Sequence, residues 1–140
     1  MKTHEALATT LHELLRGDRA VRITVDGYMP LVIEDIGRSL EGGLLIALAH
    51  TGLQNGDVMH DPEIVFEVRD IDGSLFAEPL SFRNDYVGAY SEVYVLDAEG
   101  RRSHVRPAVK SELMSFARTW FRNLREQGFL GERARREVLS

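Results

Sequence analysis

Apolar residues recur along the chain with two spacings, one typical of helices and the other of strands. Near the N-terminus four leucines follow the helical spacing, namely Leu7, Leu11, Leu14 and Leu15. Thr3 can cap such a helix with its hydroxyl, and Gly17 can end it in a left-handed conformation. The pattern therefore predicts a helix over about residues 4–16.

A series of short alternating segments follows this helix and predicts about six strands. They cover residues 21–25, 29–33, 44–50, 63–70, 75–83 and 91–97. Asp26-Gly27 predicts a type I′ turn between the first two, because both central residues of that turn need positive φ. The continuous apolar run "LLIALAH" predicts that the third strand is central and buried on both faces.

The stretch between the third and fourth strands, residues 51–62, is polar and predicts a long connection. Asn55-Gly56 readily takes left-handed dihedrals and can reverse the chain there. Asp61 precedes a proline, which favours extended backbone at the start of the next strand. A connection of this length is near the size at which loops tend to be functional.

A second helix is predicted from Pro107, which suits a first helical position, to Gly128, which can end it. Its apolar stripe consists of Leu113, Phe116, Ala117, Trp120 and Leu124. The charged tail, residues 131–140, is expected to be frayed or weakly helical. We therefore predict one α+β domain over residues 1–140, an antiparallel sheet of about six strands with an N-terminal and a C-terminal helix packed on it.

The composition is that of an ordinary globular domain, with 44% hydrophobic and 28% charged residues in a chain of 140. There is no cysteine, which excludes disulfides and thiolate metal sites. No apolar run is long enough to span a bilayer, and the first residues lack the pattern of a signal peptide. We expect a cytoplasmic protein that needs no cofactor and has no membrane partner.

Charge is distributed unevenly, because residues 1–100 are strongly acidic and residues 101–140 are basic. On the second helix Arg118, Arg122 and Arg125 fall opposite the apolar stripe and could follow a phosphate backbone. The alternative is a solvated helix face that pairs with the acidic sheet. Since an acidic body repels nucleic acid, binding of nucleic acid is possible but is not the favoured interpretation.

The polar stretch after the third strand offers candidate metal ligands, since His50, Asp57, His60 and Asp61 supply imidazoles and carboxylates. A metal-dependent hydrolase or nuclease could use them, with Glu67 and Arg69 as a degenerate Glu-x-Lys pair. The spacing matches no known ligand motif, and arginine cannot replace a titratable lysine. The alternative is a turn that presents Asn55, Asp57, His60 and Asp61 to a partner.

A second polar cluster, in "SFRNDYVGAY", combines a guanidinium, a carboxylate and two phenols. Its candidate binding residues are Arg83, Asn84, Asp85, Tyr86 and Tyr90. Tyrosine and arginine are frequent anchors of protein interfaces. The alternative is a strand–turn–strand whose tyrosines cover the edge of the core.

Three segments, "YMPLVIEDIG", "ALAHTGLQNGDVMHDPEIVFEV" and "FARTWFRNLREQGF", resemble a family of short bacterial proteins carried on plasmids, phages and integrative conjugative elements. That family is a domain of unknown function. The resemblance implies a cytoplasmic accessory protein of a mobile element and brings no activity, cofactor or catalytic residue.

These observations together favour a non-enzymatic binding module that engages a protein partner and forms a homo-oligomer. The metal-dependent hydrolase and the nucleic-acid binder stay open as alternatives. If residues 51–62 and 83–90 lie side by side in the fold, they form one recognition site.

Overall fold

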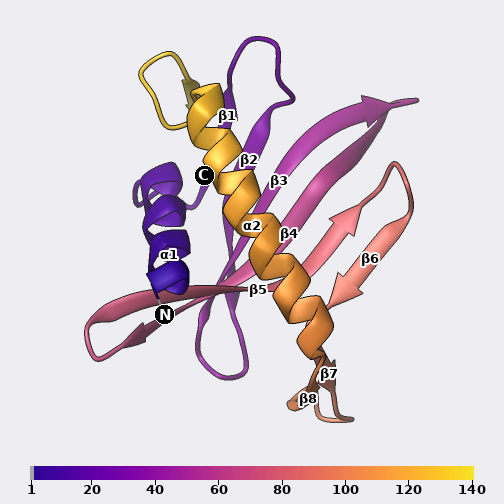
Figure 1. Cartoon of the computed structure of the whole chain (residues 1–140). Coiled ribbons are helices and arrows are strands. Elements are labelled where there is room, and N and C mark those ends of the chain that lie inside the picture. Colours follow the sequence, from indigo (N-terminus) through magenta and orange to yellow (C-terminus); the bar gives the residue numbers. More distant parts are fainter. Residues whose placement is uncertain (1) are drawn as a thin grey trace.

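The computed structural model describes residues 2–140 and contains one large antiparallel sheet, a small two-stranded sheet and two long helices (Figure 1). The elements are α1 (Lys2–Leu15), β1 (Ala20–Thr24), β2 (Leu31–Arg38), β3 (Leu44–Gln54), β4 (Asp57–Ile71), β5 (Ser74–Asn84), β6 (Ala89–Glu92), β7 (Tyr94–Leu96), β8 (Arg102–Val105), α2 (Pro107–Gln127) and β9 (Arg135–Val138). The large sheet has the order β6-β5-β4-β3-β2-β1-β9, and β7 pairs with β8.

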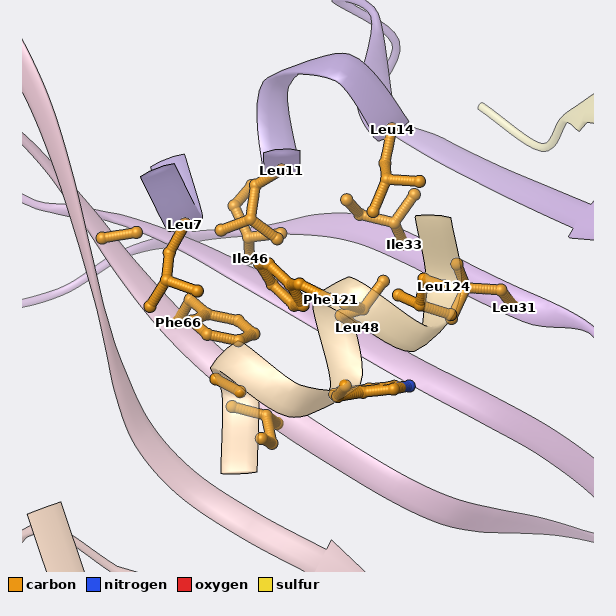
Figure 2. Packing of buried hydrophobic residues seen from close by; sticks show 14 of the residues in the cluster. Leu7, Leu11, Leu14, Leu31, Ile33, Ile46, Leu48, Phe66, Phe121 and Leu124 are labelled. Carbon is orange, nitrogen blue, oxygen red and sulfur yellow. The ribbon is translucent and has the colours of Figure 1, made fainter. Parts of the chain in front are cut away.

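The core lies between one face of the large sheet and the two helices. Leu7, Leu11 and Leu14 of α1 and Phe121 and Leu124 of α2 meet alternate residues of the strands in a single cluster, as Figure 2 shows. The strand positions in this cluster are every second residue, among them Leu31, Ile33, Ile46, Leu48, Ile64 and Phe66. The α+β class and the two helices packed on an antiparallel sheet are thus confirmed, with seven strands in the main sheet.

Strand β3 lies at the centre of the sheet and is buried on both faces. Ile46 and Leu48 face the helices, while Ala47 and Ala49 on the opposite face are also almost inaccessible to solvent. The prediction from the continuous apolar run is therefore confirmed. We call the face that carries Ala47 and Ala49 the far face of the sheet.

The helix ends agree with the prediction for α2 but not for the start of α1. Pro107 begins α2, and Gly128 ends it with a φ of 95° while its N–H bonds to the carbonyl of Arg125. Helix α1 begins at Lys2, so Thr3 lies within the helix and does not cap it.

The first strand connection also differs from the prediction. Gly27 has positive φ but Asp26 does not, so the turn after β1 is not type I′. The N–H of Tyr28 closes that turn on the carbonyl of Val25, and β2 begins only at Leu31. Pro30, which cannot donate a ladder hydrogen bond, lies just before that start.

The predicted connection over residues 51–62 is wrong, because nearly all of it is strand. Strands β3 and β4 continue in register to the pair Gln54–Asp57, and only Asn55 and Gly56 turn the chain. Their φ values of 53° and 85° fit a type I′ hairpin turn. The ladder is interrupted once, at His50 opposite Asp61 and Pro62, where the Asp61–Pro62 bond is cis.

The tail is not frayed, since Arg135–Val138 form β9 at the edge of the sheet beside β1. Arg22 and Glu137 lie opposite each other in that ladder and form an ion pair of 2.6 Å. The predicted sixth strand is two strands, because the chain leaves the large sheet at Val93 and continues as β7.

Candidate recognition surface

The two segments singled out in the sequence lie side by side where the β3–β4 and β5–β6 hairpins end on the same side of the molecule (Figure 1). His60 and Asp85 form the junction. The Asp85 N–H donates to the carbonyl of His60 at 2.9 Å, and the His60 N–H donates to Asp85 Oδ2 at 2.8 Å. The imidazole Nδ1 of His60 lies 2.9 Å from the same carboxylate oxygen.

Arg83 and Glu63 extend this junction along the far face. The Arg83 Nε donates to Asp85 Oδ1 at 2.6 Å, and its guanidinium lies 3.9 Å from Glu63. The other ring nitrogen of His60 faces Glu63 at 3.8 Å. Two hydrogen bonds hold the pKa of Asp85 well below its ordinary value: the one from Arg83 has the larger effect, and the one from the His60 backbone the next largest. Asp85 is therefore a charged anchor at neutral pH.

Asn84 and Tyr86 fasten the β5–β6 turn to the β3–β4 hairpin. The Asn84 amide donates to Asp61 Oδ1 at 2.7 Å, and its oxygen accepts from the Tyr86 N–H at 3.1 Å. The Tyr86 ring lies against Gly52, where any Cβ would collide with its hydroxyl. A Cβ at position 52 would therefore displace the ends of the Tyr86 and Met29 side chains, although the φ of Gly52 is ordinary.

Around these polar contacts the hairpin tips expose apolar side chains. Leu53 and Val58 lie opposite each other in the β3–β4 ladder with 75% and 58% of their surface exposed. Val87 at the β5–β6 tip is 74% exposed, and Tyr90 is 61% exposed. We define the hairpin-end surface as Leu53, Val58, His60, Asp61, Glu63, Arg83, Asn84, Asp85, Tyr86, Val87 and Tyr90.

Most of the predicted binding residues belong to this surface, but two lie apart from its polar centre. Asn55 and Asp57 occupy the tip of the β3–β4 hairpin and are exposed. With about 3.3 Å per strand residue, the three residues from Asp57 to His60 place the tip roughly 10 Å from the junction.

The four candidate metal ligands are not brought together. His50 packs between Trp120 and Phe129, with ring centroids 5.7 and 5.4 Å away, and its Nδ1 donates to the carbonyl of Met29. This burial lowers the pKa of His50. His60 instead meets Asp85, and Asp57 is at the distant tip. Within residues 2–140 no three His, Asp or Glu side chains are arranged to hold a metal ion.

The candidate arginines of α2 occupy its exposed side. Arg125 lies 3.4 Å from Glu13 of α1, whereas Arg118 and Arg122 take part in no ion pair within the described part of the chain. The basic C-terminal part does reach the acidic sheet elsewhere, since Arg102 pairs with Glu67 at 2.8 Å.

A second polar cluster on the far face is not indicated by the sequence. Glu67 is completely buried, and its carboxylate accepts from Arg102 at 2.8 Å, from Arg69 and from the Ser39 hydroxyl. Burial raises the pKa of Glu67, but the hydrogen bonds from Ser39 and Arg102 outweigh it and leave the pKa below its ordinary value. In the alternating pattern of β4, Glu67 looks like any exposed position.

Comparison with known protein families identifies one match. The model of the family described as Domain of unknown function (DUF6908) matches residues 2–130. The chain belongs to this family. The DUF6908 match spans α1 to the end of α2 and includes the whole hairpin-end surface, whereas β9 lies beyond it. No curated protein and no solved structure matches the chain. Among residues 2–140 no helix combines the length and apolarity needed to cross a membrane.

Proposed function

We propose that this DUF6908 protein is a non-enzymatic binding module that engages a protein partner through the hairpin-end surface. The observation that carries the proposal is the joining of two hairpins by the His60–Asp85 contacts, with exposed apolar side chains on both tips. Exposed apolar side chains that adjoin polar residues are typical of interaction sites.

The composition of the surface suits a protein partner. Tyr86, Tyr90 and Arg83 belong to the residue types that anchor interfaces. Asp61, Glu63 and Asp85 outnumber the single guanidinium of Arg83, so the surface carries excess negative charge. A partner with basic residues around an apolar patch is therefore favoured electrostatically.

The surface is also held in place before any partner arrives. The β3–β4 hairpin continues two inner strands of the sheet, and the β5–β6 hairpin lies beside it at the edge. Their side chains are joined by hydrogen bonds between residues 60 and 85 and between residues 61 and 84. A preorganised surface loses less conformational freedom on binding. On this interpretation His60 is a structural group, since both of its ring nitrogens face carboxylates.

Site-specific photo-crosslinking in the native cells tests this proposal. A benzophenone amino acid replaces Val58 or Val87, and a third variant carries it in place of Arg122 on α2 as the matched exposed control. We expect positions 58 and 87 to form an adduct with the same protein and position 122 not to form it. The proposal fails if positions 58 and 87 give no adduct, or only the adduct that position 122 also gives.

A second candidate function is nucleic-acid binding through the C-terminal arginines. The observation in its favour is that Arg118 and Arg122 are exposed without an ion-pair partner among residues 2–140. A mobility-shift assay with duplex DNA at two salt concentrations tests it, because phosphate contacts weaken steeply with salt. Binding that falls with salt and is lost in Arg118→Glu/Arg122→Glu supports this function, and absence of any shift at low salt refutes it.

We further propose, from the resemblance of three segments, that the module is a cytoplasmic accessory protein of a bacterial mobile element and acts as a homo-oligomer. Two measurements test this. The coding gene should lie within a plasmid, phage or conjugative element, and light scattering after gel filtration should give a multiple of the 15.8 kDa chain mass. A chromosomal gene without mobile neighbours, or a monomer mass, contradicts the respective statement.

A further inference from the structure

A cavity of about 320 Å³ opens on the far face of the sheet, beside the hairpin-end surface. Its floor is apolar and consists of Leu45, Val65 and Leu80 from three neighbouring strands. The turn between β2 and β3 and the β7–β8 hairpin form its walls. This volume lies at the lower end of the range of pockets that take small ligands or single side chains.

The wall formed by β7 and β8 is fixed to the sheet by Arg102. Its guanidinium donates to the buried Glu67 at 2.8 Å and lies over the Tyr94 ring, 4.5 Å from the centroid. The Tyr94 hydroxyl in turn donates to Glu78 at 3.1 Å. The cavity is therefore maintained by ionic and aromatic contacts within the chain and does not depend on a ligand to form.

The charge of Arg102 is compensated inside this network. Besides Glu67, its guanidinium lies 3.6 Å from Glu41 and 3.8 Å from Glu78. Glu92, which also lines the cavity, takes part in no ion pair within residues 2–140. The cavity thus carries, on β6, a carboxylate without an ion-pair partner beside the Tyr90 phenol, whose pKa is raised by burial and by this carboxylate, whereas the Arg102 guanidinium covers a face of the Tyr94 ring.

Glu92 beside the ring of Tyr90 attracts a cation, since both the negative charge and the ring quadrupole favour it. The apolar floor suits the methylene groups of a lysine or arginine side chain, which bury their stems while the charged head meets polar groups. The cavity adjoins the hairpin-end surface, because Tyr90 lies directly opposite Arg83 in the β5–β6 ladder.

We propose that this cavity receives a lysine or arginine side chain of the protein partner that binds the hairpin-end surface. The inference rests on the proposed function and specifies the chemistry of the partner. The basic head lies between Glu92 and the Tyr90 ring, and the stem crosses Leu45, Val65 and Leu80. The partner is accordingly a protein that presents a protruding basic residue next to its apolar contact patch.

Titration of the full-length protein with blocked tripeptides, followed by ¹⁵N–¹H NMR, tests this inference. The probes are acetyl-Gly-Arg-Gly-amide, its lysine analogue and its citrulline analogue, which keeps the shape of arginine without the charge. We expect the two basic peptides to shift the amide signals of Leu45, Val65 and Tyr94 with a dissociation constant on the order of millimolar. The citrulline peptide should bind at least about threefold more weakly.

Two variants locate the interaction. Glu92→Gln removes the uncompensated charge with little change in shape, and we expect it to weaken the arginine peptide about threefold or more. Glu112→Gln, an exposed position on α2, is the matched control and should leave binding unchanged. Thermal unfolding of both variants verifies that the fold is retained.

The inference is overturned if the basic peptides shift no cavity signal up to about 20 mM, far above a millimolar constant. It is also overturned if citrulline binds as well as arginine, or if Glu92→Gln binds like the unaltered chain. Free arginine binding tenfold more tightly than the tripeptide would indicate a small-molecule ligand and would equally overturn it. None of these results affects the adducts at positions 58 and 87, so the two proposals fail separately.

Discussion

Replacement of Glu67 by glutamine removes the charge at the centre of the far-face cluster while keeping its volume. The Glu67 carboxylate has no exposed surface and accepts hydrogen bonds from Arg102, Arg69 and Ser39. Two of these donors are guanidinium groups, so the variant replaces two ion pairs by hydrogen bonds to a neutral amide. It also leaves Arg102 with only the more distant carboxylates of Glu41 and Glu78.

The expected loss follows from the exposure of the donors. A hydrogen bond to a charged group contributes about 1.5–3 kcal/mol to stability. Arg69 has 41% of its side chain exposed, so water compensates most of its lost ion pair in the variant, and Arg69 contributes little to the loss of stability. Arg102 is only 17% exposed and dominates the effect. We therefore expect Glu67→Gln to lower the free energy of unfolding by about 2 kcal/mol at pH 7.

Urea denaturation followed by circular dichroism measures this loss, and thermal unfolding should show a decrease of roughly 6–8 °C for a domain of this size. Because the folded protein lowers the pKa of Glu67, its contribution is present at neutral pH and is lost as the pH falls through that lowered value. Glu34→Gln, at an exposed position on β2, serves as control and should change stability by less than about 0.5 kcal/mol. A loss in Glu67→Gln as small as that of the control would refute the assignment of Glu67 as the anchor of the β7–β8 hairpin.

Three further predictions concern other parts of the molecule. Burial lowers the pKa of His50, so on acidification the unfolded chain takes up a proton at this histidine before the folded chain does, and stability falls. His50→Phe should therefore make stability less sensitive to acid between pH 7.5 and 5, and equal acid sensitivity of the two proteins in denaturation experiments would contradict this. Asp85→Asn should lower the free energy of unfolding by about 1–2 kcal/mol at neutral pH, because it removes the charged acceptor of the hydrogen bonds from Arg83 and His60. An unchanged midpoint of urea denaturation would refute this prediction. Gly52→Ala should displace the Tyr86 ring, which NMR would report as new chemical shifts for that ring, whereas an unperturbed ring would show that the close approach is not required.

Much of the architecture could be predicted from the sequence because several signals act locally. Pro107 and Gly128 bound α2 through backbone constraints that hardly depend on the rest of the fold. The apolar run of β3 requires cover on both faces, and a central strand is the place in a sheet that provides it. Asn55-Gly56 reverses the chain as expected.

The errors arise where backbone pairing decides the structure and side-chain polarity does not. Residues 51–62 are polar and contain Gly52 and Pro62, so they resemble a loop, yet β3 and β4 continue to pair through their main chains beyond the core. The same applies to β9, whose residues Arg135–Val138 show no apolar alternation but complete the edge beside β1.

The candidate surface could be predicted only in part. Its polar residues and tyrosines belong, apart from Glu63, to the two clusters that the sequence indicates, whereas its exposed apolar residues Leu53, Val58 and Val87 are not predicted. The contact between the clusters depends on the β4–β5 register, which places Glu63 opposite Arg83. No local spacing encodes that register. Glu67 was missed as a buried anchor because its cover, the β7–β8 hairpin with Arg102, returns from a distant part of the chain.

The most direct test of the central claim is the affinity of the crosslinked partner for chosen variants, measured with purified proteins by isothermal titration calorimetry. Val87→Lys introduces a positive charge into the exposed apolar tip of the hairpin-end surface, and Arg118→Glu/Arg122→Glu alters the opposite layer of the molecule. Since a buried charge at an interface costs several kcal/mol and a lysine also repels a basic partner, the account predicts at least about a tenfold loss of affinity for Val87→Lys. The arginine variant should bind like the unaltered chain. Undiminished binding by Val87→Lys would contradict the account, and so would a loss of affinity confined to the arginine variant.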